Sequence, residues 1–234
     1  MQKNTKHKLP PVITLDGPSG SGKGTISLQL AKALGWHYLD SGALYRVLGY
    51  AVKLHDVPLK EVGALRQLAE ELDVVFGLEE TIIDSKIWYE GQEISQWIRT
   101  ESAGKLASEI ATIPQVREGL LERQRQFLRP PGLVADGRDM GTVVFPEANL
   151  KIFLEATLET RAKRRALQLQ QKGLNVNLGD LFQEVKARDE RDRQRSIAPL
   201  IPAQDALVID TSENTISEVL KKVLDLVRSK GLVA

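Results

Sequence analysis

The sequence predicts an α/β domain in which a five-stranded parallel sheet is flanked by helices. Five short apolar runs are centred near residues 13, 37, 134, 153 and 208, and stretches with helical periodicity separate them. Parallel strands need such crossovers, because a tight hairpin turn connects only antiparallel strands. The first run also leads directly into a glycine-rich turn, which indicates where this sheet binds a ligand.

The glycine-rich turn lies between an apolar strand at residues 12–15 and an amphipathic helix at residues 26–34. It reads Gly17-Pro18-Ser19-Gly20-Ser21-Gly22-Lys23-Gly24-Thr25. Strand, glycine turn and helix is the context of a phosphate-binding P-loop. The glycines let backbone N–H groups converge on a phosphate, the helix presents its positive end, and Lys23 adds a mobile charge. The predicted fold is therefore of the P-loop NTPase type.

The end of this turn departs from the general motif. Gly24 stands where Ser or Thr usually holds Mg²⁺. The Gly-Lys-Gly-Thr ending resembles the loop of nucleoside monophosphate kinases, so we expect Thr25 to reach the metal through water. Asp136 ends a buried-type strand at residues 133–136, and an acidic residue at that place in P-loop proteins helps to hold the Mg²⁺ shell.

The composition restricts the class of protein. Of 234 residues 42% are apolar, and the formal net charge is +1, which argues against a dedicated nucleic-acid or anionic-membrane binder. The absence of cysteine excludes disulfides and zinc–thiolate sites. The three histidines, His7, His37 and His55, show no metal-ligand spacing. No apolar run approaches the ~20 residues of a membrane span, so we expect a soluble, cytoplasmic protein.

The chain is expected to form one unit with two small additions. Residues 1–11 are mostly polar and predict a disordered tail. Between residues 72 and 99, β-prone runs at 74–76, 81–83 and 86–89 predict a small antiparallel sheet. Trp88 and Trp97 are interpreted as its packing anchors rather than as a platform for bases. With a lid at about residues 173–199, the predicted core comprises residues 12–71, 100–172 and 200–234.

Polar residues follow two of the predicted strands. Asp40 and Ser41 can cap the helix after the second strand, and Arg46 lies one turn into it. Arg138 follows Gly137, directly beyond the strand that ends at Asp136. Ligands of open α/β sheets bind beyond such strand ends. The alternatives are a simple helix cap with a surface arginine, and a structural ion pair of Arg138 with its neighbour in the chain.

Two helices are rich in arginine. Arg161, Arg164 and Arg165 share one face of a helix that begins after Thr157, and Arg188, Asp192 and Arg195 share a face of the next. A charge run is usually only a solvated face. Two such helices in a P-loop protein of near-zero net charge favour a lid that closes over phosphates and excludes water.

Four segments together resemble bacterial cytidylate kinases, a group of nucleoside monophosphate kinases: residues 16–25, 39–46, 136–146 and 188–195. The third, Asp-Gly-Arg-Asp-Met-Gly-Thr-Val-Val-Phe-Pro, is far more specific than the P-loop. The match runs from about Val12 to the last helix, and the inserted sheet resembles the enlarged monophosphate-binding domain of these enzymes. The resemblance implies ATP + CMP ⇌ ADP + CDP, dCMP as a further acceptor, Mg²⁺ as cofactor, and a monomer.

The resemblance also implies a role for individual residues by position. The donor triphosphate would be held by residues 17–25, and the acceptor phosphate by Arg46 and Arg138. Cytosine contacts or their supports would be Ser41, Ser108, Arg117, Asp139 and Arg195, and sugar contacts Arg188 and Asp192. With Lys23, the candidates for transition-state charge are Arg161, Arg164 and Arg188, of which Arg188 is also favoured by the residue pattern.

Two alternatives stay open on the sequence alone. One is another small-molecule P-loop kinase, acting on UMP, AMP or shikimate, because the base cannot be read from the acceptor contacts. The other is a nucleotide-switched regulatory or nucleic-acid-binding protein, which the net charge and the lack of an RNA-binding motif disfavour.

Overall fold

The protein was described from a computed structural model, which covers residues 9–77, 86–171, 173 and 175–233. Most of the predicted tail at residues 1–11 lies outside these residues. Leu9 to Pro11 have no regular structure, and the Pro11 carbonyl accepts a hydrogen bond from Leu133 N. Within the described residues no helix is both long and apolar enough to cross a membrane.

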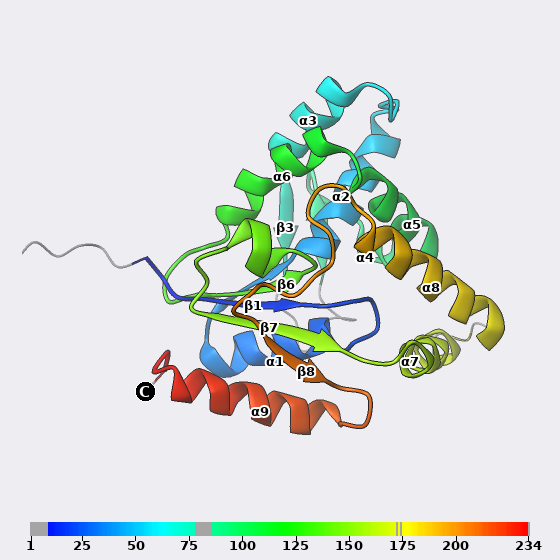
Figure 1. Cartoon of the computed structure of the whole chain (residues 1–234). Coiled ribbons are helices and arrows are strands. Elements are labelled where there is room, and N and C mark those ends of the chain that lie inside the picture. Colours follow the sequence, from blue (N-terminus) through cyan, green and yellow to red (C-terminus); the bar gives the residue numbers. More distant parts are fainter. Residues whose placement is uncertain (1–8, 78–85, 172, 174, 234) are drawn as a thin grey trace, which may run out of the picture.

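A five-stranded parallel sheet forms the centre of the molecule, which confirms the predicted fold class (Figure 1). Its strand order is β2-β6-β1-β7-β8. The strands are β1 (Val12–Asp16), β2 (His37–Asp40), β6 (Leu133–Gly137), β7 (Leu150–Glu155) and β8 (Leu207–Asp210). All carboxyl ends lie at one edge, so the turn after β1 and the loop after β6 meet there.

Helices cover both faces of the sheet. On one face, Ile13 and Leu15 of β1 pack with α1 (Lys23–Leu34) and α9 (Ile216–Ser229). On the other, Val12 belongs to a larger cluster with α2, α3, α5 and α6. These helices span Ser41–Leu54, Val62–Glu70, Glu101–Ile110 and Pro114–Arg125. Successive side chains of a strand thus pack into two separate hydrophobic cores, one on each face, as expected for a sheet buried on both faces.

The inserted sheet is antiparallel and three-stranded, as predicted, and two of its strands coincide with the predicted runs at 74–76 and 86–89. Its strands are β3 (Val74–Phe76), β4 (Ile87–Tyr89) and β5 (Gln92–Glu93). The predicted run at 81–83 lies outside the described residues, and β5 was not predicted because Gln and Glu carry no β signal. A short helix α4 (Ser95–Ile98) follows. Trp97 packs edge-to-face on Tyr50 of α2 at 5.1 Å, which confirms it as a packing anchor.

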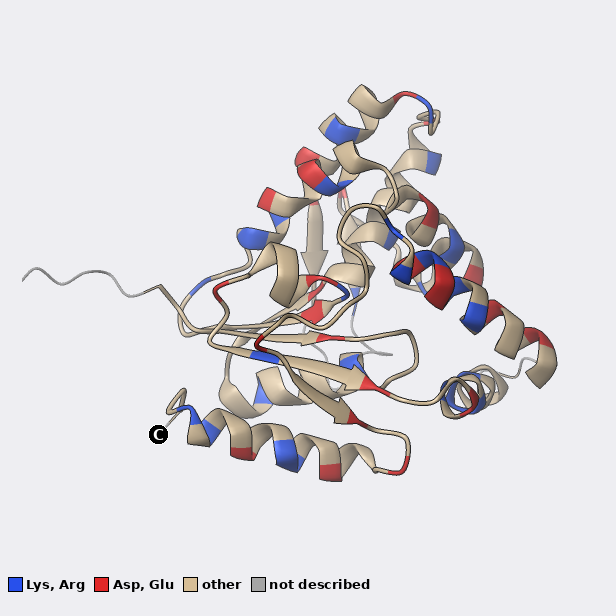
Figure 2. Ribbon diagram, viewed as in Figure 1, with Lys and Arg blue, Asp and Glu red and all other residues tan. Residues whose placement is uncertain are grey.

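Two helices lie beyond the carboxyl ends of the strands (Figure 1). They are α7 (Leu158–Gln171) and α8 (Leu178–Arg193), which pack on each other. Lys and Arg are dense on both, interleaved with acidic residues on α8 (Figure 2). A five-residue π-helix, η1 (Met140–Val144), follows β6 and was not predicted from the sequence. These elements surround the edge where a ligand is expected.

Candidate active site

The P-loop takes the conformation that its glycines predict. Gly17, Gly20 and Gly22 have φ angles of 150°, 81° and 88°. A Cβ at Gly17 would lie 2.2 Å from the carbonyl oxygen of Leu154, so no other residue fits there. Helix α1 begins at Lys23, so its free N–H groups face the same point as the loop. The loop is therefore built to hold an anion.

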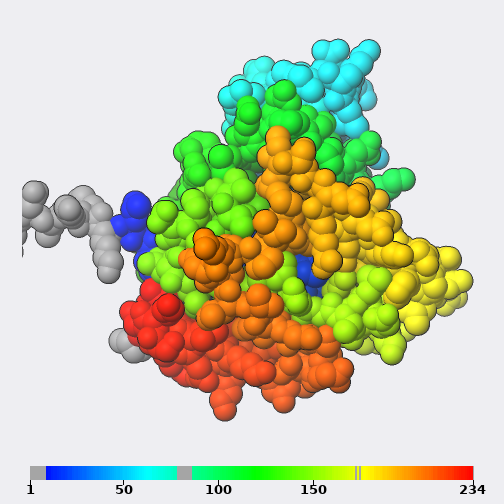
Figure 3. All heavy atoms as spheres, in the orientation of Figure 1, coloured from blue at the N-terminus to red at the C-terminus, as the bar shows by residue number. Residues whose placement is uncertain are grey.

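Two adjoining cavities open at this point, of about 450 Å³ and about 260 Å³. We call them the large and the small cavity. Figure 3 shows a hollow between the segments of α7 and α8, with part of the N-terminal segment visible inside it. Both cavities are lined by Ser19, Lys23, Gly24, Arg165, Gln168 and Arg188. Two ligands would thus meet at a shared wall that presents three cations.

The large cavity extends toward β2, α2 and the inserted sheet. Arg46 lines it, and its Nη1 donates to the carbonyl oxygens of Ile98 at 2.5 Å and Thr100 at 3.2 Å. Arg138 lines it from the end of β6, with its Nε 2.9 Å from Asp192 Oδ2. Of the residues predicted to hold an acceptor, Arg46, Arg138 and Arg188 line this cavity.

The other predicted acceptor residues do not line the large cavity. Ser41 Oγ donates to Gln124 Oε1 at 2.7 Å, and Arg117 pairs with Asp139. Ser108 is buried, and within the described residues its Oγ has no hydrogen-bond partner. The alternative of a local Arg138–Asp139 ion pair is wrong, because these two side chains pair with Asp192 and Arg117 instead.

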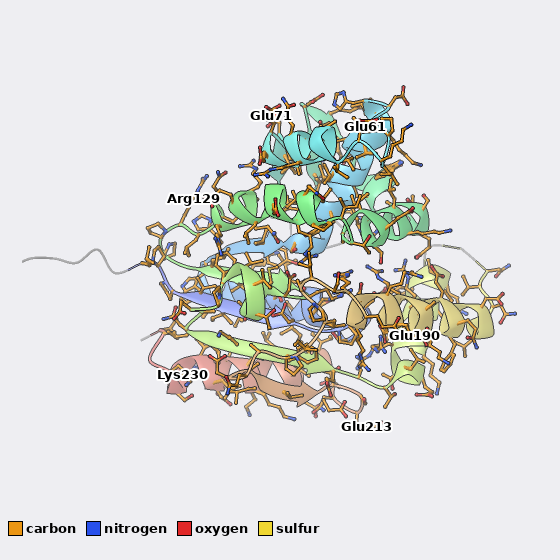
Figure 4. All side chains as sticks on the ribbon, turned by 45° about the horizontal axis from the view of Figure 1, so that its top comes forward. Glu61, Glu71, Arg129, Glu190, Glu213 and Lys230 are labelled. Atoms are coloured by element: carbon orange, nitrogen blue, oxygen red, sulfur yellow. The ribbon has the colours of Figure 1, made fainter. Side chains whose placement is uncertain are left out.

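Two carboxylates on α8 anchor it to the site. Asp192 pairs with Arg195, which the sequence placed near it, and with Arg138, a pairing that the sequence did not indicate. Asp189, one turn earlier, pairs with Arg161, whose Nη1 also donates to the Ser19 carbonyl at 3.0 Å. Helix α8 is thereby connected to Arg138, in the loop after β6, and through Arg161 to the P-loop. Charged residues remote from the cavities, such as Glu61 and Lys230, lie at the periphery (Figure 4).

The arginines predicted to stabilise transferred charge differ in their surroundings. Arg161 lines the small cavity, but its donors are engaged by Asp189, Ser19 and the Ala156 carbonyl. Arg164 lines neither cavity and donates to Thr211 O at 2.6 Å. Arg188 lines both cavities, and within the described chain its Nε has no hydrogen-bond partner. Arg188 is thus the best placed of the three to receive a phosphate.

Burial and nearby charges shift the pKa values of the ionisable side chains that line the two cavities. Burial, followed by the nearby Arg138 charge, lowers the pKa of Lys23 to about 8. Burial and Arg138 likewise lower the pKa of Arg188 to about 9. Burial raises the pKa of Asp136 despite its proximity to Lys23. Anionic phosphates would relieve the repulsion among these cations, so the site is electrostatically suited to them.

The model of the family described as cytidylate kinase matches residues 13–229. The chain belongs to the cytidylate kinase family. It is 56% identical over 223 residues to a cytidylate kinase of Marinomonas sp. (strain MWYL1), covering 95% of this chain and 98% of that protein. It is 54% identical over 225 residues to a cytidylate kinase of Stutzerimonas stutzeri (strain A1501), covering 96% and 98%. This membership confirms the predicted family and the predicted class of enzyme, a kinase and phosphotransferase.

The structure of this cytidylate kinase family member brings two further residues to the site that had no individual role from the sequence. Arg165, which the sequence placed on one helix face with Arg161 and Arg164, lines both cavities. Asp16, directly before the P-loop, accepts hydrogen bonds from Met140 N and Gly141 N at 2.8 Å each. Asp16 therefore ties the start of the P-loop to the loop that carries Arg138. Burial raises its pKa to about 7.

The residues predicted for Mg²⁺ fit a metal that is held mainly by phosphate and water. No cluster of three or more potential ligands occurs among the described residues. Asp136 lines the large cavity and Thr25 the small one, so each offers one oxygen ligand. Mg²⁺ is typically bound by one or two carboxylates, substrate phosphates and several waters. A cation would also favour the charged form of Asp136, whose pKa burial raises.

Proposed function

We propose that this kinase transfers the γ-phosphoryl group of ATP to CMP and dCMP, with Mg²⁺ as cofactor. The observation that supports transfer most strongly is the pair of cavities, which share a wall formed by Lys23, Arg165 and Arg188. A hydrolase or a nucleotide switch needs one nucleotide site, whereas transfer needs two sites that face one reacting phosphate. Membership of the cytidylate kinase family supports CMP over UMP, AMP or shikimate as the acceptor.

On the donor side, the P-loop residues 17–25 would hold the triphosphate, because they form the loop and helix start beside the small cavity. Lys23 would reach the outer phosphates. Asp136 and Thr25 would hold Mg²⁺ through water. The metal would neutralise charge on the donor phosphates.

On the acceptor side, Arg46 and Arg138 would bind the monophosphate with planar guanidinium forks. Ser41, Ser108, Arg117, Asp139 and Arg195 would bind cytosine or support its contacts, and Arg188 and Asp192 would bind the sugar. Those residues that do not line the cavity would become accessible when the acceptor enters and α8 moves. The buried Ser108 hydroxyl, which has no hydrogen-bond partner among the described residues, supports this assignment, since such groups are otherwise costly.

In the reaction, an oxygen of the CMP phosphate forms a bond to the γ-phosphorus of ATP. The bond from that phosphorus to the β,γ-bridging oxygen breaks, and its electron pair stays on ADP. The acceptor is already an anion, so no protein general base is required. Lys23 and Arg188 would stabilise the transferring charge, and Arg161 and Arg164 would contribute once the lid at about residues 173–199 closes.

We also propose that the protein acts as a monomer in the cytoplasm and that the insertion at about residues 72–99 takes part in binding the monophosphate. The central test is a coupled ADP-release assay with CMP, dCMP, UMP, AMP and shikimate offered separately. CMP and dCMP are expected to give the highest kcat/KM. Equal or better rates with another acceptor would disprove the assignment, and light scattering would check the monomer.

A further inference from the structure

Asp16 is a buried carboxylate that the proposed reaction does not use. It is the last residue of β1, so the P-loop begins directly after it. Its side chain points away from the P-loop glycines to η1, where Met140 N and Gly141 N each donate a hydrogen bond of 2.8 Å to one of its two oxygens. The residue is 5% exposed. Both oxygens are therefore committed to the first turn of η1.

Asp16 holds the loop after β6 at two points. Its backbone lies opposite Gly137 in the register of β1 and β6, and its carboxylate binds the first turn of η1. Only Arg138 and Asp139 lie between these two points. A single residue thus restricts this dipeptide from both ends.

The dipeptide needs an external cap, because its own carboxylate is engaged elsewhere. Asp139 directly precedes η1, and an aspartate at that position commonly caps the helix that follows. Here its side chain makes no capping hydrogen bond and pairs with Arg117 of α6 instead. The cap comes from Asp16, on the neighbouring strand. Arg138 is consequently fixed at the edge of the large cavity, where its Nε reaches Asp192.

Close packing makes the carboxylate hard to replace. Met140 and Gly141 are buried, and a Cβ at Gly141 would lie 2.9 Å from Thr14 Oγ1 and 3.2 Å from Lys151 Cδ. Without Asp16 two buried backbone N–H groups would lose their acceptor, which is costly. The loop would have to shift to bring them to another acceptor, and Arg138 would shift with it.

The donor side depends less on this side chain. Strand β1 pairs with β6 on one side and with β7 on the other, so the backbone of Asp16 is held without its carboxylate. The turn that follows is fixed by the close approach of Gly17 to Leu154 O. Backbone contacts thus hold the P-loop, whereas a side chain holds the loop after β6.

We propose that Asp16 is a positioning residue for the acceptor: by capping η1 from the neighbouring strand, it sets Arg138 against the acceptor phosphate. The inference rests on the proposed binding of CMP by the loop after β6. Because the P-loop starts at the next residue, Asp16 also fixes the position of the acceptor phosphate relative to the donor phosphates.

The test compares Asp16→Asn, Arg138→Ala and the double variant D16N/R138A with the wild type at pH 8, above the pKa of about 7 to which burial raises Asp16. Asparagine keeps one acceptor oxygen but turns an NH₂ group toward a backbone N–H. Coupled ADP release gives kcat and both KM values, and calorimetry gives Kd for CMP. We expect D16N to raise KM and Kd for CMP by about 10-fold and KM for ATP by less than about 2-fold. In the R138A background D16N should raise Kd for CMP by less than about 3-fold, because most of its effect acts through Arg138.

Gly141→Ala tests the same contact from the other side, and it replaces D16N if that variant does not fold. The added Cβ would push η1 away from β1 with Asp16 intact, so Kd for CMP should again rise more than KM for ATP. Val223→Ala is the matched control for lost stability, because it truncates a fully buried side chain of α9, on the opposite face of the sheet. V223A should lower Tm but leave both KM values unchanged.

Three results would overturn the proposal. They are a wild-type Kd for CMP in folded D16N or, in its place, G141A; an equal effect of D16N with and without Arg138; and an equal rise of KM for CMP in V223A. If the wild type released no ADP with CMP, the proposed function itself would fail, so the two failures are distinguishable.

Discussion

Asp192 is the residue whose removal tests the charge arrangement of the site most directly. Its carboxylate is buried on α8 between Arg138, 2.9 Å away, and Arg195. The Asp192→Asn substitution keeps the shape and one acceptor oxygen but removes the charge. Two guanidinium groups would then lie close together with no anion between them, in a region that water hardly reaches.

The size of the effect follows from this burial. Two unit charges 4 Å apart interact by about 4 kcal/mol at the effective dielectric of a partly buried site. Desolvation offsets part of this, and removing one partner of a buried pair costs about 3–5 kcal/mol. Allowing for the remaining hydrogen bond, we expect D192N to lower the free energy of unfolding by about 3 kcal/mol. For a chain of this size the corresponding fall in Tm is about 6–12 °C.

The assay is thermal unfolding of the wild type and of D192N, at neutral pH and in acid. The Asp225→Asn variant serves as the control. Asp225 also pairs with an arginine three residues away, Arg228, but both side chains are more than half exposed. D225N should cost under about 0.5 kcal/mol. Because the two arginines hold the pKa of Asp192 below its usual range, its stabilisation is present above pH ~4 and is lost as the pH falls below that value. Equal effects of D192N and D225N at neutral pH would refute the reasoning.

Three further predictions concern the P-loop and Lys23. Lys23→Ala should lower kcat by at least ~10²-fold in a folded protein, measured by coupled ADP release. Gly17→Ala, which would place a Cβ against Leu154 O, should destabilise the protein by at least about 2 kcal/mol, whereas Gly63→Ala, in an open helical position, should be neutral or stabilising. Because burial lowers the pKa of Lys23 to about 8 and a triphosphate would raise it again, ATP binding at pH 8.5–9 should take up a proton. Calorimetry in buffers of different ionisation enthalpy measures this uptake, which Lys23→Arg should abolish.

The sheet was predictable because its signals are local. Each core strand is an apolar run, and the P-loop glycines specify a strand, a turn and a helix by backbone sterics alone. For the inserted sheet, the sequence predicted a small antiparallel sheet but not all of its strands. Its strand β5 consists of Gln92 and Glu93, which pair with β4 through the turn at Gly91 and have no apolar pattern of their own. The π-helix η1 depends on Asp16, 124 residues away from Met140, so no local window contains its cause.

The site was predictable in its residue types but not in its pairings. Helical spacing correctly placed Arg188 and Asp192 on α8, and Arg195, just beyond the end of α8, pairs with Asp192. It could not show that Arg138 pairs with Asp192 rather than with its neighbour Asp139, because ion pairs across 54 residues depend on the tertiary fold. For the same reason the roles of Arg161 and Arg164 stay predictions: their donors are held by protein groups in this structure.

A near-neutral chain can therefore contain a strongly cationic site because several arginines at this site are paired with carboxylates. Asp189 and Asp192 each neutralise an arginine beside the cavities and hold it in position. Arg188 differs, because within the described residues it forms no ion pair, and burial lowers its pKa to about 9. A bound phosphate would therefore offset the cost of burying a charged guanidinium more at Arg188 than at an arginine that already has a carboxylate partner. The binding energy of the substrates is then concentrated at the wall where the two cavities meet, which is where transfer of charge requires it.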